Sequence, residues 1–269
     1  MEEMMMKKFF RAALIAVLAL IIPCAAGADA ELRGYEREAG YQYVALGSFP
    51  QTAEGEEKPV LWRVLDVQDG EAYLLSEYVL FNNRVHPDDK EYIAFGGAFN
   101  KTEMFRLLNG PFERIVISAE EEARLRKKTY YGRAYYAEMS FREQTFTEKE
   151  LSMLVTDDEL GTVFLASAAD IRNEAYGFTS DKARKGYGTD FALAGGLFQY
   201  SNGSSPYWTR TQSEQFEYGT RCTKEKGNTG YIRCVVMNEG CRPAVRLKLE
   251  GLDILAGDGT LENPFTFER

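Results

Sequence analysis

Two runs of apolar residues lie close together in the segment KPVLWRVLDVQDGEAYLLSEYVL, at residues 58–80. Both runs are rich in Val, Leu and Tyr, and they flank Asp69-Gly70, a strong signal for a tight turn. The segment therefore predicts a β-hairpin. Because side chains alternate along a strand, Trp62 and Val64 would share one face of its first strand.

Helices are predicted in the middle of the chain, where polar cap residues precede apolar runs. A Ser, Thr or Asn followed three residues later by Glu is typical of a helix N-terminus. Such pairs are Asn100 and Glu103, Ser118 and Glu121, and Thr147 and Glu150. A short buried strand is predicted at 161–167, and Ser167 with Asp170 predicts another helix start directly after it.

A long polar segment follows at residues 177–205, and it is rich in Gly, Tyr and Ser. We expect long loops there with one helical turn, and long loops in a compact domain are often where function resides. Three or four strands would then close the chain. Strands before and after a helical middle section predict a single α+β domain with antiparallel strands over residues 43–269.

The first 30 residues have the layout of a secretory signal peptide. Lys7, Lys8 and Arg11 precede eleven apolar residues at 12–22, which are too few to span a membrane. Small residues up to Ala30 fit a cleavage site. We therefore expect a protein that is secreted or held at the cell surface, with no transmembrane span after the signal is removed.

Cys24 leaves a second route to the surface open. Residues 21–24, Ile-Ile-Pro-Cys, are similar to a lipoprotein site in which Cys24 would carry a lipid, although proline directly before the cysteine is unusual there. We favour release, or retention by other means. After cleavage, the polar residues 31–42 would form a loose N-terminal segment.

Charge and composition exclude several classes of protein. The formal net charge of −9, without a basic cluster, argues against nucleic acid or an anionic membrane as the partner. Hydrophobic residues make up 45% of the chain and aromatic residues 13%. That composition supports a folded core and excludes a disordered tail.

Three cysteines fall in the part of the chain that would be exported, namely Cys222, Cys234 and Cys241. One disulfide and one spare thiol is the simplest arrangement in an oxidising compartment. The first two lie nearly symmetrically about a turn at Gly227-Asn228, and facing strands bring cysteines within disulfide reach. We expect a Cys222–Cys234 disulfide and a buried Cys241, although a one-residue change of register would undo the pairing.

Short blocks follow one another in a recognisable order. They are YVALGSFPQT from residue 43, VLWRVL from 60, NKTEMFRLLNGPF from 100, VFLAS from 163, TDFALAGGL from 189, YWTRT from 207, GCRPAVRL from 240 and GDGTLENPF from 257. As an ordered set over residues 43–265, they resemble an uncharacterised family of secreted bacterial domains. That family has Gly-x-Phe-Pro-Gln, Trp-Arg-Val-Leu, Trp-x-Arg-(Ser/Thr) and Gly-x-Arg-Pro-Ala blocks.

The resemblance implies a C-type-lectin-like fold with a distant similarity to formylglycine-generating oxidases. It implies no activity, because the family has no known function. The chain departs from the pattern at three places. Phe105 stands at or beside a tryptophan-containing segment of the family's helix, Tyr207 replaces the first of two tryptophans, and Cys241 replaces a valine.

Candidate ligand-binding residues lie in and beside the long polar loop. They combine aromatic faces with amide and charged groups, the mixture that adaptable binding loops use. The set consists of Tyr187, Asp190, Tyr200, Asn202, Tyr207, Trp208 and Arg210. A merely solvated loop is an equal alternative, and for the Trp-Arg pairs a role inside strands is favoured.

Catalytic and metal-binding motifs are weak. The single histidine, His86, would have to serve any Ser-His-Asp or Cys-His arrangement. Acidic groups at 86–91 and 156–159 lack the spacing of a calcium loop, so we expect no metal site or cofactor, with calcium as the one candidate. A copper-dependent oxidase of formylglycine-generating type would need Cys234 and Cys241 close together.

The sequence as a whole predicts an exported, non-catalytic recognition module. It would bind a glycan or a protein surface through the loop region from Gly177 to Tyr207, with no nucleic-acid partner. Two alternatives stay open, the oxidase and a structural module that joins other surface proteins.

Overall fold

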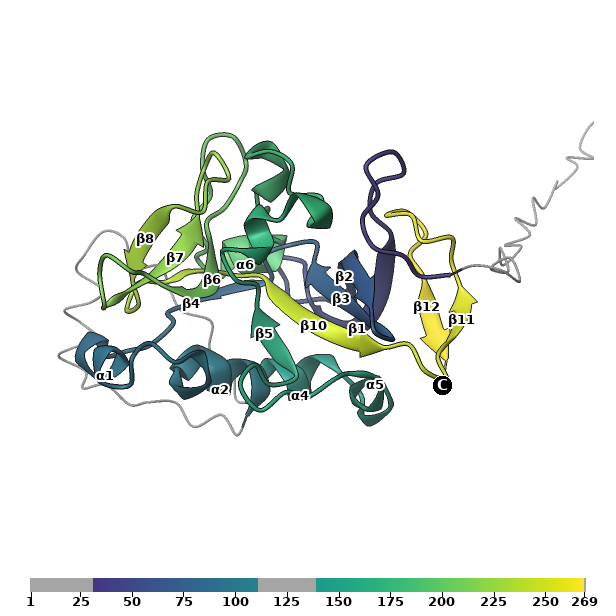
Figure 1. The fold of residues 1–269 in the computed structure, drawn as a ribbon, viewed down its shortest axis with the longest axis horizontal. Coiled ribbons are helices and arrows are strands. Elements are labelled where there is room, and N and C mark those ends of the chain that lie inside the picture. Colours follow the sequence, from purple (N-terminus) through teal and green to yellow (C-terminus); the bar gives the residue numbers. More distant parts are fainter. Residues whose placement is uncertain (1–30, 111–138, 269) are drawn as a thin grey trace, which may run out of the picture.

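The computed structural model describes residues 31–110 and 139–268 (Figure 1). They form a mixed α+β domain with mostly antiparallel sheets and few helices, as the sequence predicts. The expected signal peptide at 1–30 and the helix expected from Ser118 lie outside the described residues. None of the helices in the described ranges is long and apolar enough to cross a membrane.

The first sheet has five strands in the order β1-β2-β3-β10-β5, all paired antiparallel. They are β1 (Tyr43–Pro50), β2 (Glu57–Gln68), β3 (Glu71–Ser76), β5 (Val163–Leu165) and β10 (Pro243–Lys248). The predicted hairpin is confirmed as β2–β3. Its turn residues Asp69 and Gly70 have φ of 54° and 76°, and two positive φ angles are what a type I′ turn requires.

The second sheet has the order β4-β9-β6-β7-β8, and a separate hairpin pairs β11 with β12. Its strands are β4 (Phe81–Asn83), β6 (Tyr207–Gln212), β7 (Gly219–Thr223), β8 (Tyr231–Cys234) and β9 (Glu239–Cys241); the hairpin comprises β11 (Asp253–Ala256) and β12 (Thr266–Glu268). More strands follow the polar loop than the three or four predicted, because several have only three or four residues and therefore show no apolar run.

The helices are short. They are α1 (Asp89–Ala94), α2 (Glu103–Asn109), α4 (Phe141–Thr145), α5 (Glu148–Met153) and α6 (Asp190–Ala194). The first four lie along one side of the domain, and α6 is the helical turn predicted inside the polar loop (Figure 1).

The capping predictions are confirmed at one helix and corrected at another. Thr147 and Glu150 form the expected capping box of α5. Helix α2 begins two residues later than predicted, because the side chain of Thr102, not that of Asn100, accepts the amide hydrogen of Phe105. Asn100 belongs instead to a preceding 3₁₀ turn, Phe99–Lys101.

The first sheet separates two buried clusters. Trp62 and Val64 belong to the larger cluster, beneath the helices, and Leu65 belongs to the smaller one. The alternation predicted for β2 is thus confirmed up to Leu65. On the face of the smaller cluster, the guanidinium of Arg63 lies over the ring of Tyr41, 4.5 Å from its centroid.

Residues 31–42, expected to be loose, are tied to the domain. The amide of Tyr35 donates to the carbonyl of Leu65 over 3.2 Å, and the hydroxyl of Tyr41 donates to the carbonyl of Tyr176 over 2.9 Å. The rings of Tyr35 and Tyr41 pack 4.8 Å apart. These contacts hold the segment beside the wall of the cavity described next.

Candidate functional site

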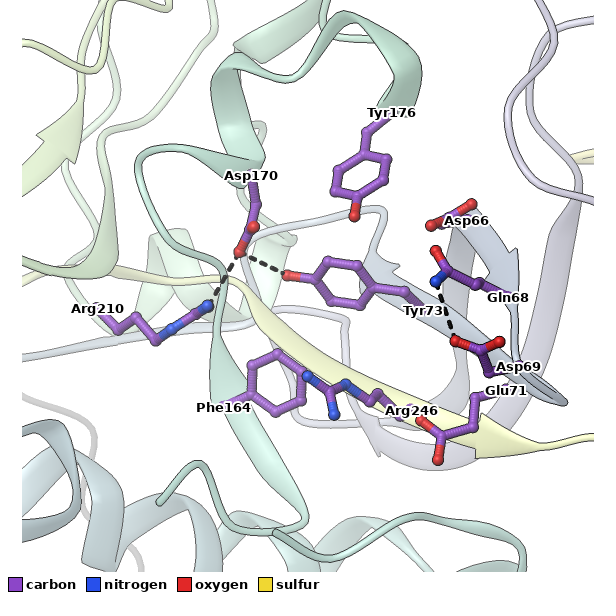
Figure 2. A pocket seen from close by; sticks show the side chains of 10 residues that line it. All are labelled: Asp66, Gln68, Asp69, Glu71, Tyr73, Phe164, Asp170, Tyr176, Arg210 and Arg246. Atoms are coloured by element: carbon purple, nitrogen blue, oxygen red, sulfur yellow. Dashed lines mark hydrogen bonds and ion pairs between the residues drawn. The ribbon is translucent and has the colours of Figure 1, made fainter. Parts of the chain in front are cut away.

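A polar cavity of about 400 Å³ opens on the smaller-cluster face of the first sheet (Figure 2). The residues that line it come from β2, β3, β5, β10, the β2–β3 turn, the segment after β5, and β6. They are Asp66, Gln68, Asp69, Glu71, Tyr73, Phe164, Asp170, Tyr176, Arg210 and Arg246. The cavity therefore collects side chains from along most of the domain.

An irregularity in β2 builds the floor of this cavity. Val64 pairs with Leu74, but the register then shifts, so that Asp66 pairs with Tyr73. Strict alternation would place Asp66 on the buried face with Val64, and the bulge moves it to the face of Tyr73. On the other side of β3, Arg246 also pairs with Tyr73. The three polar side chains thus stand in one row across the sheet.

Asp170 is the centre of the wall. Its Oδ2 atom accepts hydrogen bonds from the amide of Ser167 (2.7 Å), the hydroxyl of Tyr73 (3.1 Å) and Nη1 of Arg210 (3.0 Å). Ser167 in turn accepts the amide hydrogen of Asp170, as predicted, but this pair starts only a 3₁₀ turn, Asp170–Arg172. Since no described residue donates to Oδ1 of Asp170, this atom can accept a hydrogen bond from a ligand.

Aromatic rings fill the space between these polar groups. The rings of Tyr73 and Phe164 stack at 5.8 Å with an angle of 25°, and Tyr176 stands edge-on to Tyr73 at 5.7 Å. The guanidinium carbons of Arg210 and Arg246 lie 5.7 Å and 5.9 Å from the centroid of Phe164. The site therefore offers apolar ring surface beside charged groups.

The phenols of the cavity stay neutral. Burial raises the pKa of Tyr73, the Asp170 carboxylate raises it further, and Arg210 offsets part of this effect. Burial also raises the pKa of Tyr176. At neutral pH both hydroxyls can donate a hydrogen bond, and Asp170 already receives the one from Tyr73.

Arg210 is the predicted site residue that lines the cavity. Its neighbours Tyr207 and Trp208 are 1% exposed each, because β6 lies in the middle of the second sheet. The hydroxyl of Tyr207 donates to the carbonyl of Arg184, and Nε1 of Trp208 donates to the carbonyl of Asn83, both over 2.8 Å. The expectation that Tyr207 and Trp208 face a ligand therefore disagrees with their burial.

The other predicted residues lie on the polar loop, away from the cavity lining. Tyr187 is 44% exposed, and Asp190 is the exposed first residue of α6. Tyr200 is half-buried, and Nδ2 of Asn202 donates to the carbonyl of Glu225 over 3.0 Å. The structure thus divides the predicted set into a loop group, a buried pair and one cavity residue.

The cysteines differ from the expectation. In the β7–β8 pairing, Cys222 stands opposite Tyr231 and Cys234 opposite Gly219, so the register separates the two cysteines by three positions. All three cysteines of the described ranges are thiols, and the expected Cys222–Cys234 disulfide is not formed. Cys241 is buried, as predicted, and burial raises its pKa.

The strand order does not favour the oxidase. Strands β6 and β7 lie between β9, which carries Cys241, and β8, which ends at Cys234. At roughly 4.8 Å between neighbouring strands, three spacings place these two backbones about 14 Å apart. A copper site that needs both thiols would require the sheet to rearrange.

The acidic groups considered for calcium serve as local caps. Asp88 accepts the amide hydrogens of Lys90 and Glu91 at the start of α1, and Asp157 accepts those of Glu159 and Leu160 in a turn. Within residues 31–110 and 139–268, no group of three or more His, Cys, Asp or Glu side chains is placed to hold a metal ion.

Comparison with known proteins gives no relative to reason from. No protein-family profile matches the chain, and neither a curated protein nor a solved structure matches it. The site must therefore be interpreted from its own geometry.

Most of the cavity lining was not predicted from the sequence. One available signal was the alternation in β3, where Glu71 and Tyr73 leave a polar row beside the buried Ala72 and Leu74. The position of Asp66 carries no such signal, because the bulge that redirects it is not visible in the apolar pattern.

Proposed function

We propose that this protein is an exported, non-catalytic recognition domain of C-type-lectin-like fold, which binds a glycan in the cavity of Figure 2. The fold proposal is supported by two antiparallel-rich sheets that flank a long irregular segment, and by the ordered sequence blocks. Export is supported by the signal-like residues 1–30.

The observation that carries the proposal is the combination of groups in the cavity. Sugar rings bind through apolar C–H faces packed on aromatic rings, while their hydroxyls exchange hydrogen bonds with carboxylates and amides. The partly exposed rings of Tyr73 and Tyr176 supply ring surface. Asp66, Gln68 and Oδ1 of Asp170 supply acceptors around it.

The cavity is a better candidate than the polar loop. In the cavity, Asp170 accepts hydrogen bonds from Tyr73 and Arg210, so these three side chains are held in place before a ligand binds. This order lowers the entropy cost of binding. The loop offers exposed rings such as Phe198, which is 59% exposed. A protein ligand docked on this loop is the alternative.

The test is a glycan array probed with residues 31–269, followed by calorimetric titration of each saturable hit. Tyr176→Ala removes a wall ring, and Tyr187→Ala is the matched loop variant, since both remove one partly exposed tyrosine. We expect Tyr176→Ala to weaken binding about fivefold or more, and Tyr187→Ala to leave it unchanged. Circular dichroism verifies that both variants fold.

Two results would overturn the proposal. A complete absence of saturable glycan binding would overturn the proposed glycan-binding function. Binding that is lost in Tyr187→Ala and retained in Tyr176→Ala would move the site to the polar loop.

A further inference from the structure

Arg246 is the one arginine of the cavity lining without a partner for its charge. Nη1 of Arg210 donates hydrogen bonds to the carbonyl of Leu165 and to the carboxylate of Asp170. The Arg246 side chain lies beside Tyr73 and over Phe164, and no described residue forms a hydrogen bond or ion pair with it. Its donors are therefore available in the cavity.

Phe164 fixes how this guanidinium is presented. A planar guanidinium against an aromatic ring is held by cation–π attraction, which leaves its N–H groups directed outward in a fork. That fork matches the two oxygens of a carboxylate. Arg210, whose guanidinium lies over the same ring, forms an ion pair with Asp170. Arg246 forms no ion pair with a described residue.

The carboxylates of the cavity lining indicate which other groups the ligand carries. Asp66, Asp69 and Glu71 also line the cavity, and none of them forms an ion pair with Arg246. Carboxylates accept hydrogen bonds from hydroxyl groups, and they would repel a ligand that is anionic over its whole surface. The matching ligand has one anionic group and several hydroxyls on a ring.

We infer that the cavity selects a glycan containing a uronic acid, whose carboxylate pairs with Arg246 over the ring of Phe164. The ring hydroxyls face Asp66, Asp69 and Glu71, and the apolar face of the sugar packs on the aromatic wall. This inference rests on the proposed glycan-binding function and names its substrate class.

The experiment is calorimetric titration of residues 31–269 with a neutral oligosaccharide that carries a single glucuronate residue, with its methyl ester and with a sulfated neutral oligosaccharide. Arg246→Gln removes the charge and keeps most of the length, and Arg246→Lys keeps the charge without the fork. Arg37→Gln, at an exposed position of the N-terminal segment, is the matched control for net charge.

We expect the glucuronate-containing oligosaccharide to bind about tenfold or more tightly than its methyl ester, and Arg246→Gln to abolish this difference. Arg246→Lys should recover only part of it, and Arg37→Gln should preserve it. Because Arg246 is only partly buried, these variants should keep the wild-type circular dichroism spectrum.

The outcomes separate the two proposals. Equal binding of the acid and the ester would overturn the inference and leave glycan recognition standing, as would a preference for the sulfated sugar. Unchanged acid selectivity in Arg246→Gln would overturn the inference as well. If no glycan binds, but a peptide with a free C-terminal carboxylate does, both proposals are wrong.

Discussion

Arg63 holds Glu77 through two parallel hydrogen bonds, from Nε to Oε2 and from Nη2 to Oε1, each 2.7 Å long. Arg63 is 8% exposed, and it lies near a second arginine, Arg242, which is 1% exposed. Arg242 has no carboxylate partner among the described residues and donates instead to the carbonyl of Ser76 over 2.7 Å. Glu77 therefore compensates the charge of this buried region.

Glu77→Ala should destabilise the domain by about 3–5 kcal/mol, because it leaves a buried guanidinium uncompensated. The measurement is the free energy of unfolding from urea titration. Glu56→Ala is the control, since Glu56 pairs with Lys58 at the exposed surface, where such a pair contributes about 0–1 kcal/mol. Equal losses of unfolding free energy in the two variants would show that solvent stabilises the charge of Arg63 as well as Glu77 does.

Gly161→Ala should be far more damaging than another substitution at a left-handed glycine. Gly161 has φ of +77°, and an added Cβ would lie 2.5 Å from the side chain of Asn109. Oδ1 of Asn109 accepts the amide hydrogens of Thr162 and Val163, and Nδ2 donates to the carbonyl of Val163, which joins α2 to β5. Displacing Asn109 would leave buried polar groups without partners.

The matched control is Gly203→Ala, because Gly203 has φ of +81° and a Cβ added there would meet nothing within 4 Å. Backbone strain alone should cost about 1–2 kcal/mol there. Gly161→Ala should cost at least about 2 kcal/mol more, measured by urea unfolding of both variants. Similar values would mean that Asn109 moves aside without losing its bonds.

Local patterns in the sequence predicted much of the fold and little of the site. The β2–β3 hairpin and the α5 cap follow from contacts within a few residues, and both are confirmed. The cavity depends on β10 inserting between β3 and β5, and on the bulge before Asp66. These features are set by packing between distant segments, so no local pattern in the chain reveals them.

The cysteine prediction failed for a related reason. Symmetry about Gly227-Asn228 assumed an unshifted hairpin, but the actual register aligns Cys222 with Tyr231. Strand register is decided by the contacts of the whole sheet, including those of Trp208 on the other side of Cys222.

Thiol reactivity should follow burial. Burial raises the pKa of Cys222 and of Cys241, which keeps both in the unreactive thiol form. In folded protein, iodoacetamide should label the half-buried Cys234 first and the other two at least about tenfold more slowly, until urea unfolds the domain. Mass spectrometry of tryptic peptides gives the order of labelling. A cross-linked peptide containing Cys222 and Cys234 would contradict the observed register.

Glu239 should make the domain less stable as the pH rises towards neutrality. Its side chain is 6% exposed, and burial raises its pKa to about 7, against the opposing attraction of Arg233, whose Nε lies 3.0 Å from Oε1. Between the ordinary value of 4.5 and about 7, the folded state keeps this proton while the unfolded state has released it. The contribution of Glu239 to stability is thus greatest below pH 4.5, falls through this window and levels off above it.

The prediction is tested by comparing Glu239→Gln with wild type, because glutamine keeps the shape without titrating. The free energy of unfolding of the variant, relative to wild type, should increase from pH 5 to pH 7.5 and then stay constant. His86 acts with the opposite sign, since burial lowers its pKa and stability is lost as the pH falls below 6.5, but this contribution cancels in the difference. Glu214→Gln, at an exposed position, should give a flat difference. A Glu239 carboxyl that titrates below 4.5 by NMR would show that the ion pair with Arg233 outweighs burial, and the predicted pH dependence would reverse.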